Sequence, residues 1–291
     1  MKPPVFDYLR PATLGEALAL LAERPDAKPL AGGQSLIPAM NFRLARPAAL
    51  VDLNRVAELA YVRAADGGLR IGAMARQRAV ERSPVVQRVT PLLAEAMPFI
   101  AHPQIRNRGT VGGSLAHADP AAELPAVMLA LDARLEARSR SGTRTIPATA
   151  FFTGLFGTAL APDELLVEIA LPPLPPASGT AFVEVARRHG DYALAGAAVV
   201  VTLDGRGRCR DARMALLSVG AGPVLATEAM KVCVGESPSD EMLRAAAETA
   251  ATRDIDPPSD IHASATYRRR LVAVLTRRAL ARAVERATQV S

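Results

Sequence analysis

The chain has 291 residues, which is enough for two domains of about 150 residues each. Its 49% hydrophobic and 22% charged residues exclude a largely disordered protein. A chain of this length buries a sizeable core, so it is not a small scaffold held together by disulfides. Aromatic residues make up only 4% and tryptophan is absent, which argues against binding single-stranded nucleic acid mainly by base stacking.

The cysteines and histidines show no metal-binding pattern. Cys209 and Cys233 lie far apart in sequence, without a CxxC motif. An iron–sulfur cluster normally takes four thiolates, so this chain cannot hold one alone, and we expect both cysteines to be buried thiols. The four histidines are dispersed and lack the spacing of a zinc site. We therefore expect no metal site in this chain.

The positive charge is concentrated at the carboxyl end. Residues 262–291 contain seven arginines and one glutamate, so they account for the whole net charge of +6. Such a basic helix could bind nucleic acid or a membrane surface, or serve as a structural or docking element. Leu271, Val274, Leu275 and Leu280 fall on roughly one side of it, which predicts a structural or subunit-docking helix with outward arginines and no bound nucleic acid.

No segment is predicted to cross a membrane. Residues 1–11 lack an apolar leader, and the longest strongly apolar run, 193–203, is about half a bilayer span. We expect a cytoplasmic protein without a transmembrane segment.

In the first half of the chain the sequence predicts alternating strands and helices. Thr13 and Glu16 form a capping box, so a helix is expected over 14–23. Strands at 28–31 and 50–53 complete a small β-α-β opening unit. Further along we expect strands at 69–73, 135–139 and 165–171, a helix over 84–97 and a loop region over 98–118, where chemistry is commonly found.

Four prolines within residues 172–176 exclude a helix interior or a central strand there, so we place a domain boundary near 175. Beyond it we expect strands at 180–187, 197–203 and 213–219. A helix to about 252 then begins with Ser237 as its N-cap and Pro238 at its first position, and a second helix spans about 262–287. The predicted fold class is α+β. Its domains are 1–175, with lobes at about 1–56 and 57–175, and 176–291.

Two similar glycine segments are the strongest candidates for a binding site. Ala31-Gly32-Gly33-Gln34-Ser35-Leu36 and Val111-Gly112-Gly113-Ser114-Leu115 each join a double glycine to a serine. Paired glycines without Cβ atoms let backbone N–H groups converge on an anion, and each serine adds a donor. Two such loops could hold a pyrophosphate between them, although a double glycine is also a common turn. Neither GxGxxG after a strand nor GxxxxGK[ST] occurs, which argues against Rossmann and P-loop folds.

Two further residues have open interpretations. Asp119 precedes a proline and could accept hydrogen bonds from ligand hydroxyls, or cap the apolar helix expected over 121–131. Tyr192 lies in a turn before an apolar strand and could cover a flat ring, or pack into the core.

At these segments the chain resembles the FAD-binding medium subunits of carbon monoxide dehydrogenase and related molybdenum hydroxylases, relatives of the flavin domain of xanthine dehydrogenase. The resemblance runs from Phe6 to about Ala283. It rests on the matching segments at 31–40, 107–114, 117–123, 163–169 and 190–193.

The resemblance implies a set of cofactor-binding residues. The FAD pyrophosphate would be bound by Ala31, Gly32, Gly33, Gln34, Ser35 and Leu36 together with Thr110, Val111, Gly112, Gly113 and Ser114. It further implies that Asp119 contacts the cofactor, that Leu166 lies beside the flavin or adenine, and that Tyr192 covers the isoalloxazine. Carbon monoxide dehydrogenases often have histidine where this chain has Gln34, which argues against carbon monoxide as the substrate. No side chain is expected to be catalytic, because the flavin is the redox centre.

The resemblance also implies partners. A large subunit would carry the molybdenum cofactor, a small subunit would carry two [2Fe–2S] clusters, and the assembly would be a dimer of heterotrimers. The absence of cysteine ligands here agrees with that division of labour. The alternatives are a stand-alone flavin oxidase of the vanillyl-alcohol oxidase type and a basic nucleic-acid-binding regulatory protein.

Overall fold

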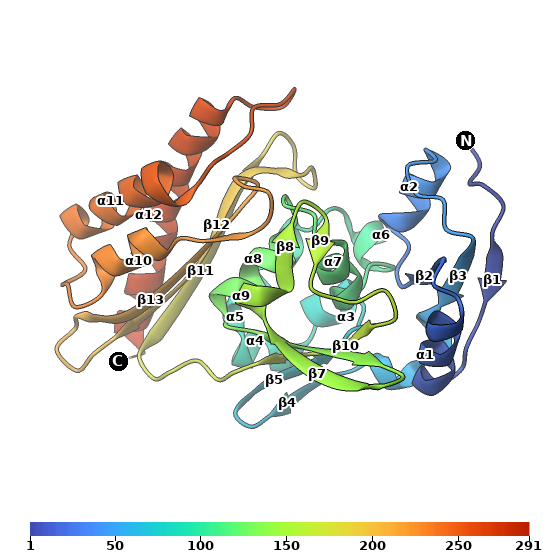
Figure 1. Ribbon diagram of the computed structural model, residues 1–291. Coiled ribbons are helices and arrows are strands. Elements are labelled where there is room, and N and C mark those ends of the chain that lie inside the picture. The colour runs from blue at the N-terminus through green and yellow to red at the C-terminus, as the bar shows by residue number, and fades with distance from the viewer. Residues whose placement is uncertain (291) are drawn as a thin grey trace.

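The computed structural model describes residues 1–290, which form three larger sheets in succession, one two-stranded sheet and the helices around them (Figure 1). A parallel sheet begins the chain, a five-stranded antiparallel sheet occupies the centre, and a four-stranded antiparallel sheet with helices ends it. The predicted α+β fold, with two amino-terminal lobes followed by an antiparallel sheet and helices, is confirmed.

The amino-terminal lobe is a small parallel sheet with a helix packed on it. The strands are ordered β1 (Asp7–Leu9), β3 (Ala49–Asp52) and β2 (Ala27–Leu30). Helix α1 (Leu14–Glu23) is the predicted one, and the Thr13 hydroxyl accepts from the Glu16 N–H at its start. A second helix, α2 (Leu36–Asn41), follows directly after the first glycine segment.

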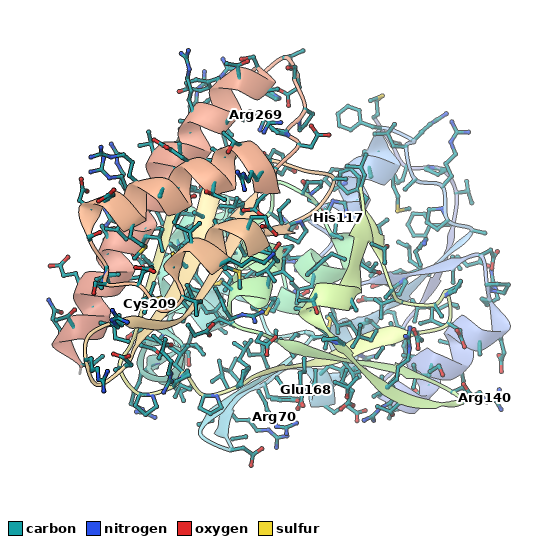
Figure 2. All side chains as sticks on the ribbon, turned by 60° about the vertical axis from the view of Figure 1, so that its left-hand side comes forward. Arg70, His117, Arg140, Glu168, Cys209 and Arg269 are labelled. Atoms are coloured by element: carbon teal, nitrogen blue, oxygen red, sulfur yellow. The ribbon has the colours of Figure 1, made fainter. Side chains whose placement is uncertain are left out.

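The central sheet is fully antiparallel. Its order is β4 (Val62–Ala65), β5 (Gly68–Gly72), β10 (Leu165–Leu171), β6 (Arg134–Ser139) and β7 (Gly142–Pro147). Figure 2 marks Arg70 and Glu168 on this sheet, where their side chains form an ion pair of 2.6 Å. Glu168 belongs to one of the matching segments, and here it stabilises neighbouring strands.

The single helix predicted over 84–97 is wrong. The chain forms α4 (Pro84–Val89) and α5 (Pro91–Ala96), separated at Thr90. Pro91 has no N–H and disfavours the helical conformation in the residue before it, so Thr90 adopts φ −136° and ψ 70°.

The loop expected over 98–118 is also partly wrong, because it contains two short helices, α6 (Pro103–Arg106) and α7 (Val111–His117). The other elements around the central sheet are α3 (Gln77–Glu81), α8 (Glu123–Ala130), α9 (Ala148–Phe151), β8 (Phe152–Gly154) and β9 (Gly157–Thr158). Short 3₁₀ turns at Leu53–Arg55, Ala57–Leu59 and Met97–Phe99 complete the region.

The carboxyl-terminal sheet lies between two layers of helices. It consists of β11 (Ser178–Ala186), β12 (Ala193–Leu203), β13 (Cys209–Leu217) and β14 (Val224–Leu225). One face packs on α10 (Thr227–Cys233), α11 (Asp240–Thr249), a π-helical turn (Ala250–Asp254) and α12 (Ala265–Gln289). The other face joins the core of the central region, so β12 is buried along its whole length.

Two local predictions in this region need correction. Ser239, not Ser237, is the N-cap of α11, so Pro238 precedes the helix and is not its first residue. In α12 the arginines do not all face outward. Arg268 is 3% exposed and donates to the carbonyls of Leu194 and Ser218, while Val274 is 47% exposed.

Two further predictions concern the cysteines and the membrane. Cys209 and Cys233 are free and buried, as predicted, and burial raises their thiol pKa values to about 11 and about 12. None of the helices formed by residues 1–290 has a long enough apolar stretch to span a bilayer.

Candidate cofactor site

The fold brings the two glycine segments into contact. A Cβ at Gly32 would lie 2.4 Å from the carbonyl oxygen of Arg108 and 2.8 Å from the Cα of Gly109. A Cβ at Gly113 would lie 3.4 Å from the Cβ of Ala31. Residues 76 to 82 positions apart in sequence therefore share one surface between the amino-terminal lobe and the central region, and Gly32 has no room for a side chain.

The first segment has free backbone donors. Gly33 adopts φ +74°, a conformation that favours glycine, and its carbonyl accepts from the Ile37 N–H as α2 begins. Within residues 1–290 the N–H groups of Gly32, Gly33, Gln34 and Ser35 have no hydrogen-bond acceptor. This segment can therefore donate several hydrogen bonds to an anion, as the sequence predicts.

The second segment differs from the expected loop, because its glycines form the first turn of α7. Thr110 is the N-cap, and its hydroxyl accepts from the Gly113 N–H at 3.0 Å. The N–H groups of Val111 and Gly112 donate to the carbonyls of Ala75 and Ala73. Its glycines thus permit close packing, but the N–H groups of Val111, Gly112 and Gly113 already have acceptors, so this segment does not offer the free donors that the first one does.

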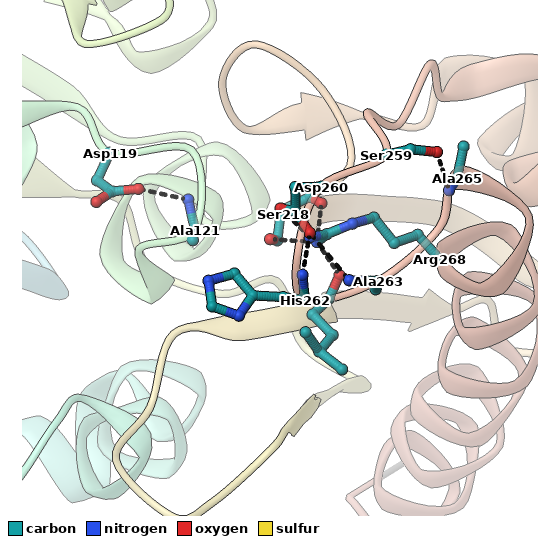
Figure 3. A network of polar contacts seen from close by, with 10 residues as sticks. Asp119, Ala121, Ser218, Ser259, Asp260, His262, Ala263, Ala265 and Arg268 are labelled. Atoms are coloured by element: carbon teal, nitrogen blue, oxygen red, sulfur yellow. Dashed lines mark hydrogen bonds and ion pairs between the residues drawn. The ribbon is translucent and has the colours of Figure 1, made fainter.

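Asp119 performs a local capping role without being a helix N-cap. Its Oδ1 accepts from the Ala121 N–H at 2.9 Å, as Figure 3 shows, and α8 begins only at Glu123. The other carboxylate oxygen has no partner within residues 1–290 and can still accept a hydrogen bond from a ligand.

Tyr192 is not a core residue. Its side chain is 71% exposed in the turn between β11 and β12. Gly190 in that turn has φ +85°, and a Cβ there would lie 2.6 Å from His102 Cε1, so the turn sits on the central region. Partial burial, together with the charges of Asp119 and Glu123, raises the pKa of Tyr192. An exposed ring here can lie against a flat ligand.

Leu166 lies behind the second glycine segment. It is 5% exposed and occupies β10 beside the bulge at Val167. The Val167 carbonyl accepts from the Ala73 N–H at 2.9 Å, and the Ala73 carbonyl accepts from the Gly112 N–H at 2.9 Å. Leu166 is thus connected to α7 through the backbone and packs within the shared core.

Two carboxyl groups near this surface, the buried Glu123 and the half-buried Glu184, were not predicted. Burial raises the pKa of Glu123 to about 7 and that of Glu184 to about 8. The charge of Asp119 adds to the shift of Glu123, and the charge of Glu123 adds to that of Glu184. Glu184 Oε2 has no hydrogen-bond partner within residues 1–290. The signal that could have revealed Glu184 is its alternation with Phe182, which faces the shared core from the same strand.

Asn54 and Arg76 were also missed, because each acts through contacts between distant parts of the chain. Asn54 Nδ2 donates to the Ala31 carbonyl at 3.0 Å, and Arg76 donates to Asn54 Oδ1 at 2.5 Å. Nothing in their local sequence indicates these contacts.

Comparison with known proteins identifies the class. Residues 4–174 match the family described as "FAD binding domain in molybdopterin dehydrogenase", and residues 180–283 match the "CO dehydrogenase flavoprotein C-terminal domain". The chain belongs to this family of FAD-binding oxidoreductase subunits, and its cofactor is FAD.

Individual relatives match over nearly the whole chain. It is 48% identical to subunit alpha of the 6-hydroxypseudooxynicotine dehydrogenase complex of Paenarthrobacter nicotinovorans, over 99% of this chain and 97% of that protein. It is 39% identical to the carbon monoxide dehydrogenase medium chain of Hydrogenophaga pseudoflava, over 96% and 97%.

Solved structures agree with this assignment. Carbon monoxide dehydrogenase from Hydrogenophaga pseudoflava superposes with a TM-score of 0.95 at 40% identity, covering 98% of this chain and 99% of that one. Quinoline 2-oxidoreductase from Pseudomonas putida 86 gives 0.93 at 41% identity, covering 99% of both chains. The family resemblance predicted from the sequence is confirmed.

Proposed function

We propose that this chain is the electron-exit subunit of a molybdenum hydroxylase. A large subunit with the molybdenum cofactor oxidises the substrate, and a small subunit passes the electrons through [2Fe–2S] clusters to this chain. FAD supplies the redox chemistry here, taking up these electrons and delivering them to an external acceptor. Relatives named as the medium chain or a lettered subunit of a dehydrogenase support such a division of labour.

The observation that carries the proposal is the contact between the two glycine segments. The unpartnered N–H groups of 32–35 can donate to the FAD pyrophosphate, and the close packing of 110–114 permits its approach. Asp119 has one carboxylate oxygen free for ligand hydroxyls, Leu166 provides apolar packing behind the site, and the exposed ring of Tyr192 covers one face of the isoalloxazine.

The proposal includes a division of the chain into two domains. Residues 1–175 form the FAD-binding unit, with lobes 1–56 and 57–175, and residues 176–291 supply the Tyr192 turn. The family ranges 4–174 and 180–283 support this division. The assembly we propose is a dimer of heterotrimers.

The first experiment is the absorption spectrum of the purified chain together with its co-purifying polypeptides. Flavin bands near about 370 and 450 nm and two further subunits, one with molybdenum and one with iron and sulfide, are expected. A flavin-containing chain that oxidises a small substrate by itself would instead indicate an oxidase of the vanillyl-alcohol oxidase type.

A further inference from the structure

A side chain at the junction of the two lobes connects both glycine segments. Arg76 precedes α3 and forms an isolated antiparallel bridge with Thr110. Its guanidinium donates through Nη1 to the carbonyl of Arg108 and through Nη2 to Asn54 Oδ1. Asn54 donates from Nδ2 to the carbonyl of Ala31. Hydrogen bonds therefore run from Ala31 in the first glycine segment to the carbonyl of Arg108, three residues before the second segment.

The carbonyl that Arg76 holds is also the one that touches the first segment. The Arg108 oxygen lies 2.4 Å from the position of a Cβ on Gly32, so it is enclosed between Gly32 and the guanidinium of Arg76. Moving Arg76 would release this carbonyl and change the separation of the two segments.

Arg76 places a positive charge beside the site, and none of the residues 1–290 contacts it directly as an acidic partner. It is half-buried, and its hydrogen-bond acceptors within residues 1–290 are neutral oxygens. Burial and the nearby charge of Arg108 lower its pKa, while Asp52 opposes this effect. Because desolvating a cation is unfavourable unless an anion or good acceptors compensate, the position favours a nearby anionic ligand.

We infer that Arg76 is a positioning residue for the FAD pyrophosphate, which fixes the spacing of the two glycine segments and adds positive charge beside them. This inference rests on the proposed function and adds to it a residue outside both motifs. Asn54 shares this role, because its side chain accepts a hydrogen bond from Arg76 and donates one to the Ala31 carbonyl.

The test is ligand binding to the full apo chain with three probes. They are FAD, ADP, which has the adenosine and the pyrophosphate but no flavin, and riboflavin, which has the flavin ring and ribityl chain but no phosphate. Arg76→Met should weaken FAD and ADP binding about 10- to 100-fold, the range for hydrogen bonds to charged groups. Riboflavin affinity should change less than about twofold. Arg76→Lys keeps the charge but cannot donate to both acceptors with the planar guanidinium geometry, so an intermediate loss of FAD and ADP affinity is expected.

Three variants complete the design. Arg63→Met is the matched control, because Arg63 is exposed and lies over Tyr61, outside the site. Asn54→Ala removes the hydrogen bonds between Arg76 and Ala31 at their other end. It therefore tests the inference even where Arg76→Met does not fold. Gly32→Ala tests the site itself, because its Cβ would collide with the Arg108 carbonyl.

The outcomes separate the inference from the proposed function. Unchanged FAD and ADP affinity in Arg76→Met and Asn54→Ala, with FAD lost in Gly32→Ala, overturns the role of Arg76 alone. An equal loss of all three probes in Arg76→Met shows a general structural role and also overturns it. Retention of FAD in Gly32→Ala contradicts the proposed pyrophosphate site, and the inference with it.

Discussion

Replacing Glu184 by glutamine should stabilise the protein at alkaline pH and have little effect at acidic pH. Burial raises the pKa of this carboxyl from its ordinary 4.5 to about 8. The folded protein therefore prefers the neutral acid, and wild-type stability falls as pH rises from about 4.5 through 8. Glutamine has nearly the same shape and stays neutral, so it removes this loss.

The size of the effect follows from the shift. Each pKa unit corresponds to about 1.36 kcal/mol, so a rise from 4.5 to about 8 gives an upper limit of roughly 5 kcal/mol above pH 8. The nearby Glu123 shares in this effect, because its charge is one cause of the Glu184 shift. We expect Glu184→Gln to gain about 2 to 4 kcal/mol relative to wild type at pH 8.5, and less than about 1 kcal/mol at pH 5.

Urea unfolding followed by circular dichroism at the two pH values measures both differences. Glu241→Gln is the control, since Glu241 is exposed on α11 and its replacement should leave the pH dependence as in wild type. Equal gains at pH 5 and pH 8.5 would refute the reasoning, because they would show that ionisation of Glu184 is not involved.

Other predictions concern the cofactor site and α12. Gly33→Val and Gly113→Val should abolish FAD retention, which is measured as flavin absorbance per chain. Valine disfavours the φ of +74° that Gly33 adopts, and a Cβ on Gly113 would lie 2.7 Å from the Thr110 hydroxyl oxygen. The control Gly15→Ala, with nothing within 4 Å, should keep full occupancy, and full occupancy in both valine variants would contradict the site. Tyr192→Ala should keep FAD but alter its spectrum, redox potential and reoxidation rate; no change in any of them would show that Tyr192 does not cover the ring. A titration with random duplex DNA at near-physiological salt should show no binding tighter than about 10⁻⁶ M, and tight salt-sensitive binding lost on truncation after Ala265 would contradict the structural role of α12.

Local patterns predicted the elements that depend on local physics. The helix at 14–23 follows from its capping box and apolar spacing, and the strands of the carboxyl-terminal sheet follow from their apolar runs. Thr90 shows a limit of this approach, because a proline inside an otherwise helical pattern ended the helix. Gly112 and Gly113 show another, since a double glycine usually indicates a turn but here begins a helix capped by Thr110.

The glycine motifs of the candidate site could be identified from the sequence, but the contacts that join them could not. The pair at 32–33 and the pair at 112–113 were identified from sequence, yet which N–H groups are free depends on acceptors such as the Ala73 carbonyl. Arg76 and Arg268 illustrate the same limit. Arg76 follows the apolar residues 73–75, and Arg268 is the first of three consecutive arginines. In both cases only the fold directs the guanidinium toward a backbone carbonyl far away in sequence.

The most direct test of the account is a crystal structure of the full chain with FAD bound. We expect the pyrophosphate oxygens within about 3.2 Å of backbone N–H groups in residues 32–35, against Gly112 and Gly113, with the Tyr192 ring on the isoalloxazine. A pyrophosphate bound elsewhere, with the N–H groups of 32–35 facing solvent, would contradict it.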